Sequence, residues 1–174
     1  MMHVTLQTLS AADIPAMWQI NEEGLPGVGK VTPEALSDLL TLCEHPLGAY
    51  EGEDLVGFVL CLLPKTRYGS PNYAWFNTRY TEFLYVDRIA VGQRSRDRQI
   101  GAALYGRVIA LAEEKQWPVA AEVSLNPPNP GSMRFHRRHG FEAVGELEHR
   151  TYSVAMVLRP PSHDPQNPRR ADGL

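Results

Sequence analysis

Arginines and a glycine gather at one place in the middle of the chain. Residues 93–102 read Gln-Arg-Ser-Arg-Asp-Arg-Gln-Ile-Gly-Ala, so three arginines come shortly before a glycine. An apolar helical pattern follows, which places this stretch at the mouth of a helix. The first turn of a helix leaves about four backbone N–H groups without partners, and its dipole favours an anion. The stretch therefore predicts a cradle for a pyrophosphate, with an exposed basic helix start as the alternative.

Two carboxylates interrupt apolar stretches that read as strands. Glu122 lies inside Val-Ala-Ala-Glu-Val, and Asp87 lies inside Leu-Tyr-Val-Asp-Arg. Glutamate is depleted in strands and rarely buried without a partner, so Glu122 is the first candidate for proton transfer. Asp87 is the second candidate, although an ion pair with the neighbouring Arg88 is the favoured alternative for it. Glu82, at the start of the strand, is a weaker candidate.

The elements that must position these groups follow from hydrophobic periodicity. Residues 84–91 are rich in β-branched and aromatic side chains, as a largely buried strand should be. One helical stripe, with steps of three and four residues, is formed by Ile100, Leu104, Val108 and Leu111. The strand at 84–91, the basic turn and the helix that starts near Ile100 therefore follow one another directly in the chain.

The remaining stretches continue this pattern of strands and helices. Their boundaries are set by helix caps, by proline in a first helical turn, by helix-ending glycine and by turn residues. Further strands are expected at 3–9, 47–50, 55–63, 117–125, 141–145 and 149–158. Further helices are expected to start at Ser10, Thr32 and Asn129, the last one closing at His139 before Gly140. Between Asn21 and Lys30, three glycines and a proline predict a mobile connection.

Residues 64–80 form an aromatic stretch that is unlike the rest of the chain. Its rings stand among glycine, serine, proline and asparagine, so we expect a loop that carries Tyr68, Tyr73, Trp75, Phe76 and Tyr80. Because such a loop exposes apolar surface, it is either a lid that faces a substrate or a contact between subunits. The second option leaves a homodimer open.

Length and composition favour one globular domain. The chain has 174 residues, 43 % of them hydrophobic, and a net charge of −3. These values suit a single domain over residues 1–159 with a sizeable core. The tail, residues 160–174, combines prolines with polar residues and is expected to be disordered. Neither nucleic acid nor an anionic membrane is expected as a partner, because the basic groups are local and suit a small polyanion.

Cysteine usage and the N-terminus indicate a compartment. Cys43 and Cys61 are the only cysteines and lie in apolar stretches, so buried thiols are favoured over a disulfide. The first residues lack the charged and apolar regions of a signal peptide, and no apolar run approaches the ~18 residues of a membrane span. We therefore expect a cytoplasmic protein. No metal site is predicted.

Two motifs resemble those of one enzyme family. Arg96-x-x-Gln99-x-Gly101 resembles the coenzyme A-binding signature of the GNAT acetyltransferases, Q/R-x-x-G-x-G/A, with Gln99 in place of the usual first glycine. Because backbone amides do most of the binding in such a loop, glutamine is accommodated there if its φ is negative. A second stretch resembles the closing motif of the family: Asn129-x-x-Ser132-x-x-Phe135-His136-x-x-x-Gly140-Phe141.

The resemblance covers roughly residues 3–158 and implies a fold and a cofactor. A GNAT domain is an α/β (α+β) fold with a mixed, mostly antiparallel sheet of six or seven strands, splayed central strands and about four helices. Acetyl-CoA would enter the slot between the fourth and fifth strands. Its pyrophosphate would lie on the backbone amides of Arg96, Asp97, Arg98, Gln99, Ile100, Gly101 and Ala102. Its pantetheine arm would pair with Ile89, Ala90 and Val91, and would contact Asn129, Ser132 and Phe135 on the other side.

For catalysis, the resemblance implies direct attack of an amine on acetyl-CoA. Glu122 would be the base, because several relatives carry one in this strand, and Asp87 comes second. His136 stands where many relatives carry a tyrosine that protonates the thiolate, and a histidine can donate a proton near pH 7. The alternatives are a His136 that contacts the thioester sulfur without proton transfer, or one that points away on the helix surface. A backbone N–H within 89–91 would stabilise the oxyanion.

The expected acceptor is an amine of a small molecule, with a protein N-terminus as the second choice. Its pocket would be built from Asn21 and the segment after it, from Tyr73, Trp75 and Phe76, and from the last strands. The aromatic character suits an amine through cation–π contact, or an apolar side chain. Two other interpretations stay open, namely an acyl-CoA-binding module without catalysis and a protein whose basic turn binds ATP or a nucleotide sugar.

Overall fold

The computed structural model describes residues 3–162. Within this range the chain forms seven strands and five α-helices. The strands are β1 (Val4–Thr8), β2 (Glu44–Glu51), β3 (Asp54–Leu62), β4 (Leu84–Val91), β5 (Val119–Asn126), β6 (Glu142–Glu148) and β7 (Ser153–Arg159). The helices are α1 (Ile14–Glu23), α2 (Pro33–Leu42), α3 (Pro71–Asn77), α4 (Ile100–Lys115) and α5 (Pro130–Arg138), with short 3-10 helices η1 (Ala11–Asp13) and η2 (Gln93–Ser95). Residues 163–174 of the tail predicted to be disordered lie outside the described range.

The strands form one mixed sheet in the order β1-β2-β3-β4-β5-β7-β6. The pairs β1–β2, β2–β3, β5–β7 and β6–β7 are antiparallel. β4 and β5 are parallel, with Leu84 opposite Val119 and Tyr85 opposite Ala120. The predicted mixed, mostly antiparallel sheet is therefore confirmed.

The internal contacts of the chain define two compact units. The first consists of the residues up to 68 together with 86–108, and the second consists of 69–85 together with the residues from 109 on. The first unit holds β1–β3, α1, α2 and the turn that follows β4. The second holds α3, β5–β7 and α5.

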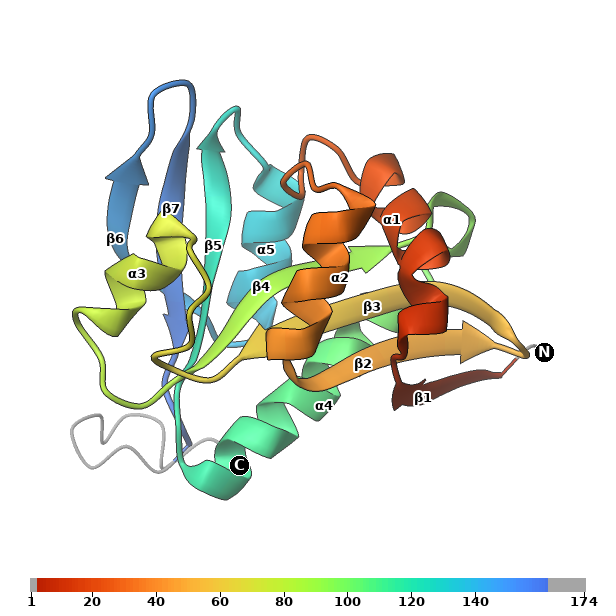
Figure 1. Ribbon diagram of the computed structural model, residues 1–174. Helices are drawn as coiled ribbons and strands as arrows, with labels where there is room; N and C mark the ends of the chain where they lie inside the picture. The colour runs from red at the N-terminus through yellow and green to blue at the C-terminus, as the bar shows by residue number, and fades with distance from the viewer. Residues whose placement is uncertain (1–2, 163–174) are drawn as a thin grey trace. The chain divides into compact units, whose positions relative to one another are not determined.

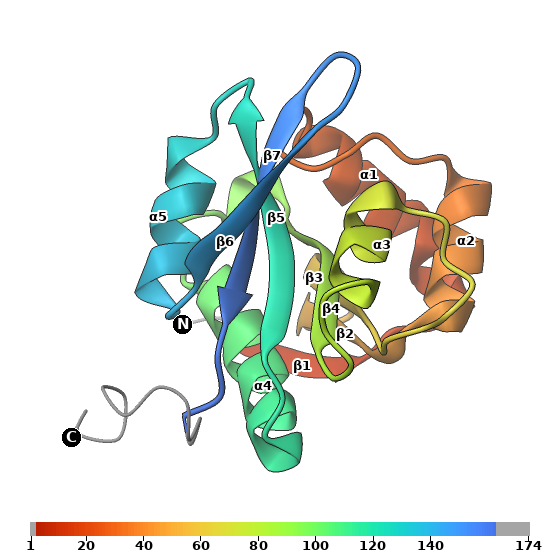
Figure 2. The same cartoon turned by 90° about the vertical axis from the view of Figure 1, so that its left-hand side faces the viewer.

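Helix caps explain where the first unit places its helices. The Ser10 N–H donates to the Asp13 carboxylate at 2.8 Å, which fixes the entry into η1 and α1. The Thr32 hydroxyl oxygen accepts the Ala35 N–H at 3.1 Å and starts α2 at a first-turn proline. Both starts were predicted. α1 and α2 lie on one face of β2 and β3, and the beginning of α4 lies on the other face (Figures 1 and 2).

The aromatic stretch of residues 64–80 is not a loop, so this prediction is wrong. Residues Pro71–Asn77 form α3, whose start is set by the Ser70 hydroxyl, which accepts the Tyr73 N–H at 3.4 Å, and by a first-turn proline. Tyr73 is 1 % exposed and Phe76 is fully buried. The Tyr73 ring packs against Tyr85 at a centroid distance of 5.2 Å, so these aromatic side chains belong to the core of the second unit.

α3 is fixed to the β6–β7 hairpin at two points within the second unit. The Asn72 side-chain oxygen lies 2.8 Å from His149 Nε2. Trp75 covers Gly145 so closely that a Cβ at this glycine would lie 2.5 Å from Cζ2 of the indole. α3 and α5 lie on opposite faces of β5, β7 and β6 (Figure 2).

The last helix begins and ends as the sequence predicts. The Asn129 side-chain oxygen accepts the Ser132 N–H at 3.2 Å, which caps the start of α5. Gly140 has a φ of 89°, the left-handed conformation that commonly follows a helix end.

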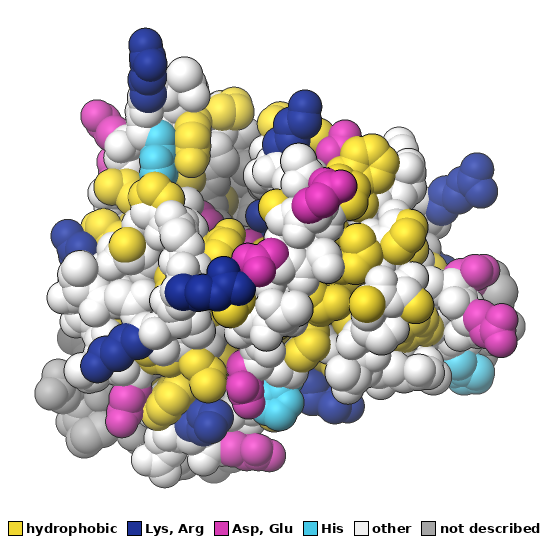
Figure 3. Space-filling model, in the orientation of Figure 1, with side chains coloured by type: hydrophobic (Ala, Val, Ile, Leu, Met, Phe, Trp, Pro, Cys, Tyr) yellow, Lys and Arg dark blue, Asp and Glu magenta, His cyan; other side chains and the backbone are white. Residues whose placement is uncertain are grey.

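Two surface properties bear on partners. In the part of the chain that the structure describes, no helix combines the length and the apolar character needed to cross a bilayer. Positive and negative side chains are interspersed over the face drawn in Figure 3.

The contact between Gly145 and Trp75 makes a first prediction. A methyl group at Gly145 has no room against the indole, so Gly145→Ala should lower the free energy of unfolding by about 1–3 kcal/mol, as overpacking does. Urea unfolding measures this loss. The same substitution at Gly69, where an added Cβ has no neighbour within 4 Å, is the control and should change stability much less. A Gly145→Ala variant as stable as the wild type would contradict the contact.

Candidate active site

The turn after β4 is held by its own backbone. The Gly92 N–H donates to the Val56 carbonyl at 2.8 Å, and the Ser95 N–H donates to the Gly92 carbonyl at 2.9 Å. Ser95 is buried, at 7 % exposure, although it stands among charged residues. The turn is therefore tied to β3 before the chain enters α4.

The first turn of α4 offers backbone donors. The Ala103 N–H donates to the Gln99 carbonyl at 3.0 Å, so the amides of Ile100, Gly101 and Ala102 lie in the turn where a helix supplies no acceptor. Ile100 is 3 % exposed and anchors the helix start in the core. An anion fits such a helix end, because the donors and the dipole both point at it. Binding of a pyrophosphate at this helix start stays a prediction.

Gln99 adopts a conformation opposite to the expected one. Its φ is 60°, and Asp97 in the same turn has a φ of 63°. Both values lie in the left-handed region, which glycine adopts without steric cost and which other residues avoid. The condition stated for a glutamine at this position, a negative φ, is therefore not met.

Two of the arginines in the turn are engaged with protein groups. Arg98 Nη1 lies 2.6 Å from a carboxylate oxygen of Glu51, at the end of β2. Arg96 donates from Nη2 to the Glu23 carbonyl at 2.9 Å and from Nε to the Val91 carbonyl at 3.4 Å. These side chains hold the turn to the rest of the first unit, whereas Arg94, in η2, is exposed.

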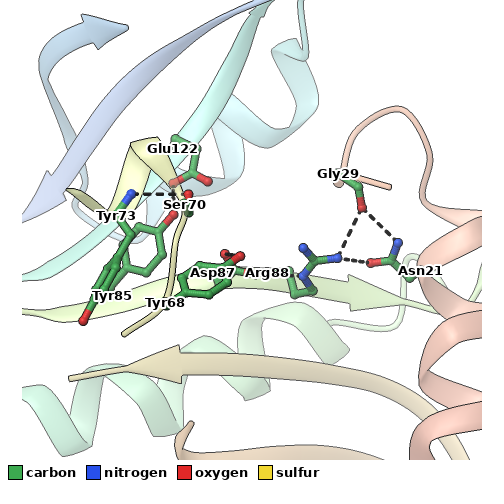
Figure 4. Close-up of polar contacts among 9 residues, drawn as sticks. All are labelled: Asn21, Gly29, Tyr68, Ser70, Tyr73, Tyr85, Asp87, Arg88 and Glu122. Carbon is green, nitrogen blue, oxygen red and sulfur yellow. Dashed lines mark hydrogen bonds and ion pairs between the residues drawn. The ribbon is translucent and has the colours of Figure 1, made fainter. Parts of the chain in front are cut away.

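Glu122 has a hydroxyl partner that the sequence did not reveal. In the second unit, the Tyr85 hydroxyl donates to a carboxylate oxygen of Glu122 at 2.7 Å (Figure 4). Tyr85 is fully buried, whereas Glu122 is partly exposed. The carboxylate is therefore oriented by a fixed donor, as a side chain that moves protons requires.

Asp87 forms the ion pair that was the favoured alternative for it. Its Oδ2 accepts from Arg88 Nε at 2.8 Å, and its Oδ1 accepts from the Tyr68 hydroxyl at 2.7 Å. The side chains of Asp87 and Arg88 are only 4 % and 10 % exposed. Burial acts to lower the pKa of Arg88, but the charge and hydrogen bond of Asp87 outweigh it and raise that pKa. Asp87 is therefore engaged with a buried guanidinium, as the alternative of an ion pair predicts.

Arg88 also reaches the segment predicted to be a mobile connection. Its Nη1 donates to the Asn21 side-chain oxygen at 3.0 Å and to the Gly29 carbonyl at 3.2 Å (Figure 4). Asn21 is fully buried and donates from Nδ2 to the same Gly29 carbonyl at 3.0 Å. Asn21, predicted to bind substrate, thus lies in α1 and ties both ends of the segment to β4.

His136 is buried, so the alternative of a surface histidine is wrong. It is 4 % exposed, and its Nδ1 lies 2.8 Å from the Ser132 carbonyl oxygen. Burial lowers the pKa of His136 to about 4, and the hydrogen bond to Ser132 and the neighbouring His139 are smaller influences. At neutral pH the imidazole is uncharged, so the expected proton donation near pH 7 is not supported.

The other predicted site residues lie in several elements and differ in exposure. Ile89, Ala90 and Val91 end β4, and Ala90 is 7 % exposed. Ser132 and Phe135 lie on α5 with His136. Glu82 is exposed and precedes β4. Of the aromatic residues predicted to contact substrate, Trp75 is partly exposed, whereas Tyr73 and Phe76 are covered by the core.

Comparison with known proteins identifies the family. A family model described as the acetyltransferase (GNAT) family matches residues 14–141, well over half of the chain. No match was found among curated proteins.

Solved structures share the fold at low sequence identity. Ard1 from Thermoplasma volcanium is similar with a TM-score of 0.73 and 20 % identity, over 91 % of this chain and 97 % of that one. The ribosomal-protein-S18-alanine N-acetyltransferase from Escherichia coli has a TM-score of 0.73 and 13 % identity, over 95 % and 98 % of the two chains. NAA60 from Arabidopsis thaliana has a TM-score of 0.71 and 16 % identity, over 90 % and 97 %. The family match, together with the shared fold, shows that this chain belongs to the GNAT family and is an acetyl-CoA-dependent N-acetyltransferase.

Proposed function

We propose that the protein moves an acetyl group from acetyl-CoA to a primary amine of a small molecule, by direct attack in a ternary complex. The observation that carries the proposal is the strand carboxylate of Glu122, which is partly exposed and oriented by the Tyr85 hydroxyl. The chain contains no long acidic run that would suit a polycationic peptide.

A protein N-terminus is the second candidate acceptor. The printed name of the Escherichia coli structure refers to an alanine of ribosomal protein S18, whereas another similar structure is called a putative phosphinothricin N-acetyltransferase. Both kinds of acceptor therefore occur with this fold, and an acceptor panel must include amines and short peptides.

Glu122 supplies the basic group that the reaction needs. An alkyl amine with a pKa near ~10.4 must lose a proton before it attacks at pH 7, at a cost of about 4–5 kcal/mol. A carboxylate on the path of this proton lowers the barrier by general base catalysis. Bound acetyl-CoA supplies the acetyl group as a thioester. A backbone N–H within 89–91 is proposed to stabilise the oxyanion. His136 is not assigned the role of acid for the departing thiolate, because its buried imidazole is uncharged.

The cofactor contacts are proposed for the backbone of residues 96–102, with Ile89, Ala90 and Val91 along the pantetheine arm. Contacts from Asn129, Ser132 and Phe135 stay predictions. The test is a calorimetric titration with acetyl-CoA, with ATP as the control, followed by thiol release over the acceptor panel. Binding without thiol release would favour an acyl-CoA-binding module, and binding of ATP in competition with acetyl-CoA would favour a different nucleotide-binding protein.

Gly101→Glu tests the cradle. A carboxylate and its bulk in the first turn of α4 should repel the pyrophosphate and weaken acetyl-CoA binding at least about 100-fold, as loss of charge-assisted contacts predicts. Gly106→Glu is the matched control, because Gly106 lies further along the same helix, exposed, with no neighbour within 4 Å of an added Cβ. Calorimetry on both folded variants decides the question, and equal affinities would refute the cradle.

Variants at Gln99 distinguish the contribution of the turn's backbone conformation from that of the glutamine side chain. Gln99→Gly should keep acetyl-CoA affinity within about twofold, because glycine adopts a φ of 60° readily. Gln99→Val should weaken binding by about tenfold or more, because a β-branched residue is strongly disfavoured at positive φ and displaces the turn. If Gln99→Gly loses affinity as Gln99→Val does, the glutamine side chain itself contacts the ligand.

Glu122→Gln tests the base. The amide keeps an acceptor for the Tyr85 hydroxyl but takes up no proton, so kcat should fall by about 10²–10⁴ while the Kd of acetyl-CoA changes less than about twofold. Steady-state kinetics over a pH series, with calorimetry for the Kd, measures both values. A rate that has the same pH dependence in the variant and the wild type would remove Glu122 from this role.

A further inference from the structure

We propose that Arg88 is a positioning residue that holds the acceptor segment, defined here as residues 24–30, in the conformation that receives the amine. The inference rests on the proposed function and on the prediction from the sequence that this segment helps to build the acceptor pocket. The hydrogen bonds that support it lie entirely within the first unit (Figure 4).

The Gly29 carbonyl is the point at which the segment is held. It accepts one hydrogen bond from Arg88 Nη1 at 3.2 Å and one from Asn21 Nδ2 at 3.0 Å. Arg88 Nη1 also donates to the Asn21 side-chain oxygen at 3.0 Å, so the three groups form a closed triangle. Each member of the triangle orients the other two.

Packing does not hold this part of the segment. Gly29 is exposed, and a Cβ added there would meet no atom within 4 Å. The three glycines give the segment many alternative conformations in the absence of a tie. The polar triangle therefore acts on the Gly29 carbonyl itself, next to the Val28 N–H bond to the Gly24 carbonyl at 3.2 Å and the Trp18 bond to the Val31 carbonyl at 3.0 Å. At its beginning, Arg96 donates to the Glu23 carbonyl at 2.9 Å.

The shape of arginine suits this position, and lysine does not replace it. Arg88 points Nε at Asp87 and Nη1 at the triangle, two directions that one planar guanidinium serves at once. A lysine ammonium keeps the charge and the pair with Asp87, but a single nitrogen does not also reach the Gly29 carbonyl and Asn21. Arg88→Lys therefore loosens the segment without leaving Asp87 unpaired in a buried place.

The first test measures the segment directly. In Arg88→Lys, amide hydrogen exchange in residues 24–30 should rise by about tenfold, the factor expected for the loss of one charge-assisted hydrogen bond. Exchange in β2 and β3 should stay as in the wild type. Arg67→Lys is the matched control, because Arg67 forms an exposed ion pair with Asp38 in the same unit. Asn21→Asp is a second variant that keeps a partner for Arg88 but removes the Nδ2–H donor to Gly29.

The second test measures catalysis with the best amine of the panel. Arg88→Lys and Asn21→Asp should raise the KM for the amine by about tenfold and leave the Kd of acetyl-CoA within about twofold. A general loss of structure would raise both, so the split identifies positioning. The proposal is overturned if hydrogen exchange stays at the wild-type level in both variants. It is also overturned if the Kd of acetyl-CoA rises as much as the KM for the amine. A wild-type protein that acetylates no amine refutes the proposed function instead, and the exchange result still decides whether Arg88 holds the segment.

Discussion

The first unit depends on the buried ion pair between Asp87 and Arg88. Removing two charges from water costs several kcal/mol per ion, and the cost is recovered only if every polar atom of the pair finds a partner. Here the partners are the Tyr68 hydroxyl, the Asn21 amide and the Gly29 carbonyl. They come from two parts of the chain, residues 21–29 and Tyr68, which are 19 to 67 positions away from the pair. The need to satisfy one pair of charges therefore fixes α1, the segment after it and the chain that leads out of β3.

The turn after β4 shows a division of labour between backbone and side chains. Arg96 and Arg98 bind protein groups, and the left-handed residues Asp97 and Gln99 set the path of the backbone into α4. If the proposed cofactor site holds, anion binding there would be a property of amide groups at a helix start and would not depend on any particular side chain. This explains why the family signature has glycine at the position of Gln99, and why a glutamine keeps the same turn at some conformational cost.

Local signals predicted much of the fold. The strand at 84–91, the caps at Thr32 and Asn129 and the hairpin after β2 were all found from short-range patterns, and the structure confirms them. α3 was missed because the density of aromatic residues suggested a loop, although Ser70 and the proline after it carry the same signal that was recognised at Thr32.

The contacts of the candidate site were harder to predict than its residues. Glu122 and Tyr85 are 37 positions apart, and Arg88 and Asn21 are 67 positions apart. No local pattern encodes such distances, because strand order and helix placement bring these residues together. The expectation that His136 donates a proton near pH 7 failed for a related reason: it assumed an ordinary pKa, whereas tertiary packing buries the ring and lowers that pKa.

The buried ring of His136 makes the stability of the fold decrease as the solution becomes acidic. Burial lowers the pKa of His136 to about 4, from an ordinary value of 6.5. Between these values the unfolded chain binds a proton that the folded protein does not, so the free energy of unfolding decreases as the pH falls from 6.5 towards 4. One pKa unit corresponds to about 1.4 kcal/mol, which makes the total loss about 3 kcal/mol. A loss of this size is a large share of the stability of an ordinary domain, so a residue buried by packing makes the fold sensitive to acid.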